Sequence, residues 1–207
     1  MKSHNGFSAR DDDNDAYRLV NASPATVLNT IKASNYGDHN LVVYPCIGQF
    51  EDFYVECCKD SILKRNEIFV LVTYYQGVSA VRKKMHLAGI DATGYENDGT
   101  LLILDSEIAY QPNLEESAKY NIIILTTMLT KLVRLREKKG ITFLSDLGTF
   151  ILNNRIADLL SYELSMPPRF GSNIRAFCCY HKDDFNILQE DKRRRICGHH
   201  LNNLIVS

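Results

Sequence analysis

The sequence predicts a three-layer α/β domain, in which a mostly parallel central sheet is covered by helices on both faces. The first reason is that short apolar runs alternate with segments of helical periodicity, which is typical of parallel strands joined by helical crossovers. The second is that the runs at 68–74 and 101–104 are apolar on both faces, as strands between two helical layers are. The third is composition: 45% of the 207 residues are hydrophobic and 24% are charged, which excludes wholesale disorder.

The first half of the predicted domain contains three strands separated by helices. Pro45 closes the first strand, and Gly89 is placed to end the second helix. The apolar residues of each helix recur at intervals of three and four residues. In chain order we expect a strand at 41–44, a helix over 47–62, a strand at 68–74, a short helix over 78–85 and a strand at 101–104.

A long helix opens the second half. Glu115 and Glu116 lie at its predicted start and Lys138 and Lys139 near its end, an order that suits the helix dipole, and Gly140 stops it. In chain order we expect this helix over 115–139, a strand at 141–146, a helix over 150–164, a strand at 174–180, a helix capped by Asp183 or Asp184 that reaches residue 197, and a short strand at 204–206.

Two units are predicted along the chain: residues 1–24 as a flexible acidic arm, and residues 25–207 as a single domain. The arm is polar and carries the acidic run at 11–15, and such a run is usually solvated. No repeat and no low-complexity linker divides the remainder of the sequence.

The charges are balanced, with 24 Lys and Arg against 25 Asp and Glu and a net charge of −1. Nothing global therefore attracts nucleic acid or an anionic membrane. Two basic clusters, at 134–139 and 192–195, are interpreted as solvated helix faces, so we expect no nucleic-acid partner. Because no apolar run approaches about 20 residues and the start of the chain lacks an apolar core, we expect no membrane partner and a cytoplasmic location.

The carboxyl ends of the predicted strands are where a ligand would bind. In open parallel sheets ligands lie beyond this edge, where the crossover loops diverge. We therefore expect a small, weakly charged molecule to bind in a cleft rich in tyrosine and carboxylate. If Tyr74 and Tyr75 still belong to a strand, at most one of them faces this cleft. The residues delivered to the edge are Tyr44, Tyr74, Tyr75, Asp105, Asp146, Tyr180 and His181.

The loop after strand 68–74 lacks the features of a phosphate-binding loop. Such a loop needs the pattern G-x-x-x-x-G-K-[ST], in which glycines expose backbone amides to the phosphates and a lysine supplies charge. Here Gly77 is the one glycine, two tyrosine rings stand at the approach, and Lys83 falls more than a turn into the next helix. Asp146 ends an apolar strand, as does the acid that holds magnesium-bound water in nucleotide-hydrolysing enzymes, but it can equally cap the next turn. We expect no catalytic residue and no nucleotide hydrolysis.

Cysteines and histidines near the end of the chain raise two further alternatives. As zinc donors they lack the paired C-x₂-C and H-x₃-H spacing, and adjacent donors do not converge easily. As a nucleophile, Cys179 with His181 or His200 would need an exposed thiolate, whereas its apolar run argues for burial. We therefore expect no metal and no cofactor. The candidate donors are Cys178, His181, Cys197, His199 and His200.

These segments together resemble a degenerate RecA/KaiC-type domain and, more narrowly, the MEDS sensory family (methanogen/methylotroph DcmR-type sensory domains). The resemblance spans roughly residues 36–207. It is carried by the opening segment 39–44, by 74–80 in place of a phosphate-binding loop, by the strand 141–146, and by the closing segments 177–185 and 199–206.

The resemblance implies a KaiC-like fold without ATPase machinery that senses a small molecule. It singles out His39, Tyr44, the pair Cys179 and Tyr180, and His200 as recurring family positions, although His39 and His200 can equally be structural residues. No kinase, receiver or helix-turn-helix segment is visible, so a signal would pass through a partner protein or through self-association. The alternatives are a divergent nucleotide-hydrolysing enzyme and a pure assembly module.

Overall fold

Within the described residues, seven parallel strands form one sheet in the order β1-β7-β2-β6-β5-β3-β4. The structure is a computed structural model that describes residues 19–110 and 118–207, with side chains of its longest helix from Thr126 onward. The strands are β1 (Val20–Ala22), β2 (His39–Tyr44), β3 (Ile68–Thr73), β4 (Leu101–Asp105), β5 (Ile141–Asp146), β6 (Ile174–His181) and β7 (Asn202–Val206).

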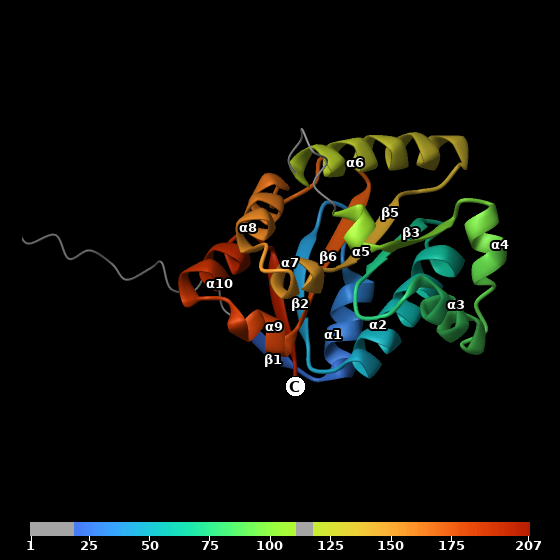
Figure 1. Cartoon of the computed structure of the whole chain (residues 1–207). Helices are drawn as coiled ribbons and strands as arrows, with labels where there is room; N and C mark the ends of the chain where they lie inside the picture. Colours follow the sequence, from blue (N-terminus) through green and yellow to red (C-terminus); the bar gives the residue numbers. More distant parts are fainter. Residues whose placement is uncertain (1–18, 111–117) are drawn as a thin grey trace, which may run out of the picture.

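Helices cover both faces of this sheet (Figure 1). One layer consists of α1 (Pro24–Ala33), α2 (Ile47–Lys59) with its π-helical extension η2 (Asp60–Lys64), α3 (Val78–Leu87) and α4 (Ala92–Asn97). The other contains α6 (Ala118–Leu135), α7 (Gly148–Leu152), α8 (Ile156–Ser165), α9 (Lys182–Ile187) and α10 (Glu190–Cys197), and the short α5 (Ser106–Ala109) follows β4. The predicted three-layer α/β fold is confirmed, and the arrangement is consistent with a RecA-like domain.

Side chains alternate between the two layers along the central strands. In β2, Val42 and Tyr44 belong to the core on the α1–α2 side, whereas Leu41 and Val43 belong to the core on the α8–α10 side. Every residue of β2 and β3 is buried, as expected for strands covered on both faces. The same alternation in β6 places Cys179 on the α1–α2 side and Cys178 and Tyr180 on the α8–α10 side.

The neighbouring strands β2 and β6 send the chain to opposite faces of the sheet. β2 leads into α2 in one helical layer, and β6 leads into α9 in the other. The carboxyl ends of β2 and β6 are therefore a topological switch point, the place where ligands bind in open α/β sheets. This is where the topology leads us to look for the predicted ligand site.

Buried Arg175 in β6 anchors the other end of the sheet. Its guanidinium donates to Thr142 Oγ1 at 2.8 Å and to the Ile31 carbonyl at 3.0 Å, and it pairs with Glu67 Oε2 at 3.2 Å. Since these charges are matched by several hydrogen bonds, we interpret the network as structural.

Three predicted boundaries are wrong. The arm does not extend to residue 24, because β1 pairs with β7 and Ser23 caps α1; residues 1–18 of the predicted arm lie outside the described residues. The helix predicted over 150–164 is two helices, α7 and α8, because Asn154 adopts a left-handed conformation with φ of 53°. The helix predicted to reach residue 197 is also two, α9 and α10, and His181 rather than Asp183 or Asp184 caps the first.

The predicted long helix is observed from Ala118 to Leu135, and its expected start at residue 115 lies outside the described residues. Helices α1 and α4 and the edge strand β1 were not predicted. Among the helices in the described part of the chain, none is long and apolar enough to cross a membrane.

Candidate functional site

Asp146 lies at the centre of the carboxyl edge of the sheet, fully buried at the end of β5. Its Oδ2 accepts a hydrogen bond from the Tyr44 hydroxyl at 3.2 Å, and its Oδ1 accepts one from the Gly148 amide at 3.1 Å. The amides of Tyr74 and Tyr75 also donate to this carboxylate. Burial raises the pKa of Asp146 to about 7, against the opposing influence of these hydrogen bonds. Asp146 therefore organises the surrounding turns, which is the capping alternative considered from the sequence.

Aromatic rings cover this carboxylate. Tyr74 and Tyr75 lie beyond the end of β3, with ring centroids 5.3 Å apart, so the alternation rule that would separate them does not apply. The His181 ring lies 5.6 Å from Tyr75 and 5.5 Å from Tyr44. Tyr75 also donates its hydroxyl hydrogen to the carboxylate of buried Asp184. Tyr74, Tyr75 and His181 are half-buried, so this aromatic group is reachable from solvent.

The two tyrosine rings pack directly on the main chain of the β5–α7 turn. A Cβ atom placed on Gly148 would lie 2.9 Å from the Tyr75 ring and 3.0 Å from the Tyr74 ring. Nothing larger than glycine fits at position 148 unless these rings move. The space next to Asp146 is thus filled by aromatic carbon.

The loop after β2 is a second place where a phosphate could bind in this fold. The sequence prediction concerned the loop after β3, but the loop after β2 lies at the point where β2 and β6 lead to opposite helical layers. That loop is Pro45 and Cys46, and it supplies neither glycine nor lysine. After β3, Lys83 is exposed and Lys84 pairs with Glu51 at 2.6 Å. Neither loop offers the backbone and charge that a phosphate-binding loop needs.

Two of the predicted ligand residues lie apart from this group. Asp105, at the end of the edge strand β4, caps α5 by accepting a hydrogen bond from the Glu107 amide at 2.8 Å. Tyr180 faces the opposite helical layer and donates its hydroxyl hydrogen to Glu163. Of the predicted set, Tyr44, Tyr74, Tyr75, Asp146 and His181 come together at the carboxyl edge.

A second group of polar side chains is buried between the sheet and the α8–α10 layer. It consists of His39 from β2, Glu163 from α8, Cys178 from β6 and His200 from the turn before β7, and we name it the His–Glu–Cys–His cluster. One ligand atom from each of these residues lies within 4.8 Å of those of the other three. His39 and His200, two positions that the resemblance singled out, thus meet, and the cysteine beside them is Cys178 rather than Cys179.

Alternation along β6 explains why Cys178, and not Cys179, lies beside these histidines. Cys178 and Tyr180 face the α8–α10 layer, whereas Cys179 faces the α1–α2 layer, close to Cys57 and Asp146. Burial raises the pKa of both adjacent thiols well above the usual range, with further contributions from nearby carboxylates. Neither Cys178 nor Cys179 is therefore a thiolate nucleophile, in agreement with the sequence argument from burial.

The cluster contains groups that can hold a metal ion. His39 Nε2 lies 3.3 Å from Cys178 Sγ, Cys178 Sγ lies 3.5 Å from Glu163 Oε2, and His200 Nε2 lies 3.4 Å from the same oxygen. Burial, together with neighbouring His200 and His199, lowers the pKa of His39 to about 2, so this imidazole is neutral. Neutral imidazole, thiol sulfur and carboxylate oxygen form a donor set that transition metals favour.

Half of this cluster was not predicted from the sequence. Of the five candidate zinc donors near the end of the chain, Cys178 and His200 belong to the cluster; His199 instead contacts the Met166 carbonyl and His181 lies at the carboxyl edge. One signal was present in the sequence. Glu163 lies on the apolar stripe of its helix, at helical spacing from Leu159, Tyr162 and Met166, and a carboxylate at such a position indicates a buried polar group. All four residues are buried in the structure.

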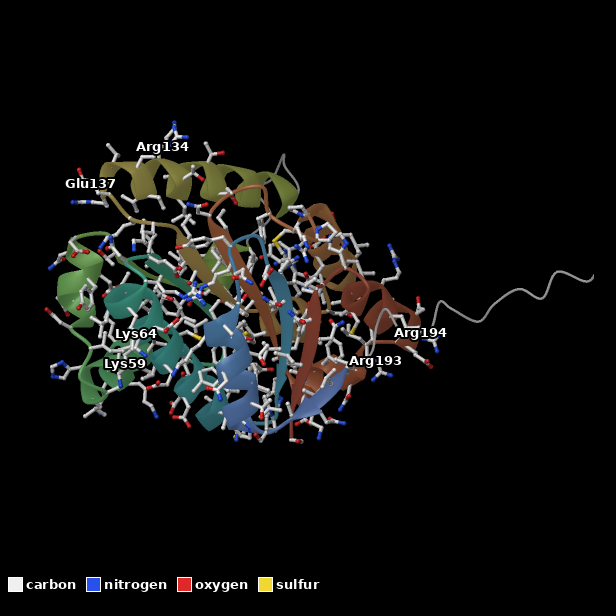
Figure 2. The ribbon with its side chains drawn as sticks, turned by 180° about the vertical axis from the view of Figure 1, so that it is seen from behind. Lys59, Lys64, Arg134, Glu137, Arg193 and Arg194 are labelled. Atoms are coloured by element: carbon white, nitrogen blue, oxygen red, sulfur yellow. The ribbon has the colours of Figure 1, made fainter. Side chains whose placement is uncertain are left out.

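The basic clusters lie at separate places on the surface. Arg134 near the end of α6 and Arg193 and Arg194 on α10 are at distant ends of the molecule (Figure 2). A nucleic-acid site needs its cations on a shared surface with aromatic residues between them. This separation supports the prediction that the two clusters are solvated helix faces.

No known protein-family model matches the chain, and none of the curated proteins matches it.

Proposed function

We propose that the chain is a sensory module that binds a small, weakly charged molecule at the carboxyl edge of its sheet and does not hydrolyse nucleotides. The observation that carries the proposal is the packing of Tyr74 and Tyr75 on Gly148 above the buried carboxylate of Asp146. A nucleotide would need exposed backbone amides and a lysine at this place. The resemblance to the MEDS family agrees with this proposal.

The chemistry of the edge favours an uncharged ligand with a flat or apolar part. The half-buried rings of Tyr74, Tyr75 and His181 offer aromatic surface, together with a hydroxyl and an imidazole at their rims. Ligand sites commonly bury apolar ligand surface against aromatic rings and orient the ligand through a few polar groups. The buried acid Asp146 has its oxygens occupied by protein donors, so its carboxylate is not free to bind an ammonium group.

A ligand at this position would act on both helical layers. Tyr75 follows β3, which leads into α3, while His181 caps α9 by accepting a hydrogen bond from the Asp183 amide at 3.3 Å. Tyr75 also bonds to Asp184 inside α9. A molecule that parts Tyr75 from His181 would shift α9, and a ligand that prefers this shifted state changes its population. A partner protein or a second copy of the chain would detect the shift.

The test has two arms. Native mass spectrometry of the purified protein, followed by a thermal-shift screen of neutral aromatic and aliphatic compounds, is expected to identify a ligand. Its binding is expected to fall at least about tenfold in Tyr75→Ala, which corresponds to about 1.4 kcal/mol. Tyr36→Ala, at a tyrosine outside the site, is the matched control and should bind as the wild type does.

The second arm incubates the protein with ATP and Mg²⁺. We expect neither saturable ATP binding nor phosphate release. Phosphate release that disappears in Asp146→Asn would overturn the proposal in favour of the nucleotide-hydrolysing alternative. A ligand whose affinity is unchanged in Tyr75→Ala would also overturn the assignment of the site.

A further inference from the structure

We propose that His39, Glu163, Cys178 and His200 form a closed binding site for one tetrahedral divalent transition metal ion, and that Zn²⁺ is the ion that fits best. This inference is independent of the ligand proposed at the carboxyl edge. The four donors come from β2, α8, β6 and the turn before β7, so an ion among them would join four elements.

Three of the six separations between the donors match a zinc-sized tetrahedron, and the other three are at most 4.8 Å. Bonds of about 2.0–2.3 Å to nitrogen, oxygen and sulfur place neighbouring ligand atoms about 3.3–3.8 Å apart. The observed separations are 3.3 Å from His39 Nε2 to Cys178 Sγ, 3.5 Å from that sulfur to Glu163 Oε2, and 3.4 Å from that oxygen to His200 Nε2. These three edges lie within or close to that range.

His200 supplies an independent reason for an ion. Its Nδ1 lies 2.8 Å from the Ile196 carbonyl, which can only accept, so Nδ1 carries the hydrogen. In the neutral ring, Nε2 then presents a lone pair, and it is aimed at the carboxylate of Glu163. His200 Nε2 is buried and has no partner in hydrogen-bond geometry among the described residues.

Two acceptors that face each other in a buried place cost free energy unless a cation lies between them. A proton would convert His200 into an imidazolium paired with Glu163. A metal ion would use that lone pair and also bind His39 and Cys178, which a proton cannot do. The convergence of all four donors favours the metal ion.

The surroundings of the cluster are those of a metal site. The Tyr180 hydroxyl donates to Glu163 Oε1, which leaves Oε2 to face the other donors. The Ile196 carbonyl fixes the ring orientation of His200. Hydrogen bonds of this kind typically orient the ligands of metal sites.

The donor set selects the type of ion. Imidazole and thiolate suit Zn²⁺, Co²⁺ and Ni²⁺, whereas Mg²⁺ and Ca²⁺ prefer oxygen ligands. Four protein donors leave no open position for water or substrate, so the site is of the structural or sensing type. Cys178 loses its proton when the ion binds, and the S–metal bond replaces the S–H bond.

The first experiment uses the wild-type chain purified without chelators. Elemental analysis is expected to find about one Zn²⁺ per chain. After removal of Zn²⁺, titration with Co²⁺ is expected to give the intense visible bands of a tetrahedral site and a thiolate-to-cobalt charge-transfer band. X-ray absorption of the Zn²⁺ form is expected to show one sulfur neighbour at about 2.3 Å among nitrogen and oxygen neighbours.

The variants use the two adjacent cysteines as a matched pair. Cys178→Ser is expected to lose the charge-transfer band and to weaken Co²⁺ binding at least about tenfold, whereas Cys179→Ser, on the opposite side of the sheet, should keep both. If the folded wild-type protein takes up neither Zn²⁺ nor Co²⁺, the proposal is overturned. The alternative, in which a proton lies between His200 and Glu163, is then favoured. A zinc spectrum without sulfur would also overturn the proposal, and that result does not depend on whether any variant folds.

Discussion

The carboxyl edge and the His–Glu–Cys–His cluster both include residues of the neighbouring strands β2 and β6, but their polar groups are matched in different ways. At the edge, Asp146 is surrounded by donors, since Tyr44, Gly148 and the amides of Tyr74 and Tyr75 all bond to it. In the cluster, His200 Nε2 lies 3.4 Å from the Glu163 carboxylate and makes no hydrogen bond among the described residues. Asp146, whose position at the end of an apolar strand resembles that of a magnesium-binding aspartate, thus has its oxygens already hydrogen-bonded by the protein.

The two regions differ in whether the folded structure needs a ligand: the cluster needs one, whereas the carboxyl edge can bind one but is stable without it. The edge is half-exposed and complete by itself, so a molecule that binds there can come and go. The cluster is buried and incomplete, so an ion that binds there belongs to the folded structure. Three predictions test this difference, from the largest expected effect to the smallest.

The largest effect is expected from Glu163→Ala in the cluster. The change leaves the buried Tyr180 hydroxyl without its acceptor and removes one of the four ligands of the proposed ion, so we expect the free energy of unfolding to fall by about 3–5 kcal/mol. Tyr75→Ala at the half-exposed edge should cost only about 1–2 kcal/mol. Urea denaturation at neutral pH measures both. Equal losses in the two variants would contradict the distinction between a complete and an incomplete region.

The second effect is a pH dependence at the edge. The pKa of Asp146 is raised from 3.8 to about 7 in the folded state, mainly by burial. The folded state therefore binds more protons than the unfolded state between these values, and the free energy of unfolding falls as pH rises from about 4 to 7. At about 1.4 kcal/mol per pKa unit, we expect a loss of about 2–4 kcal/mol over this range.

Asp146→Asn isolates this effect. The amide cannot ionise, so the difference between the wild-type and variant curves of stability against pH should contain the whole contribution of Asp146. A carboxyl ¹³C titration of Asp146 gives its pKa directly. A difference curve that is flat from pH 4 to pH 7, or an Asp146 that is fully ionised at pH 5, would show that the hydrogen bonds outweigh burial.

The edge could be predicted from the sequence because topology alone brings it together. Parallel strands end at one side of the sheet, so Tyr44, Asp146 and His181 were expected at the same edge once their strands were recognised. The strand order, which the sequence did not predict, decides which of them are neighbours, and Asp105 on the edge strand β4 lies apart. The helix breaks could not be predicted in the same way. At Asn154 the apolar periodicity continues on both sides of the break, and the left-handed backbone interrupts the helix without a proline or glycine to mark it.

The cluster could not be predicted because it depends on which helical layer each face of a strand or helix contacts. Alternation says that Cys178 and Cys179 point to opposite layers, but the sequence does not say which one faces His39. Glu163 is far from the other donors in the chain, and only the packing of α8 on the sheet brings it to them. Spacing rules for metal sites find donors that are close in sequence, and these four are not.

The smallest effect is expected from Gly148→Ala, which tests whether the tyrosine rings truly fill the edge. The new Cβ would lie 2.9 Å from the Tyr75 ring and 3.0 Å from the Tyr74 ring, so we expect a loss of about 1–2 kcal/mol in stability. Gly48→Ala in the first turn of α2, where a Cβ meets nothing within 4 Å, is the matched control and should be neutral or slightly stabilising. In the Tyr75→Ala background one clash is relieved, and the cost of Gly148→Ala should fall by about half or more. An unchanged cost in that background would mean that the strain lies in the turn itself, and the account of the edge as a place filled by aromatic rings would be wrong.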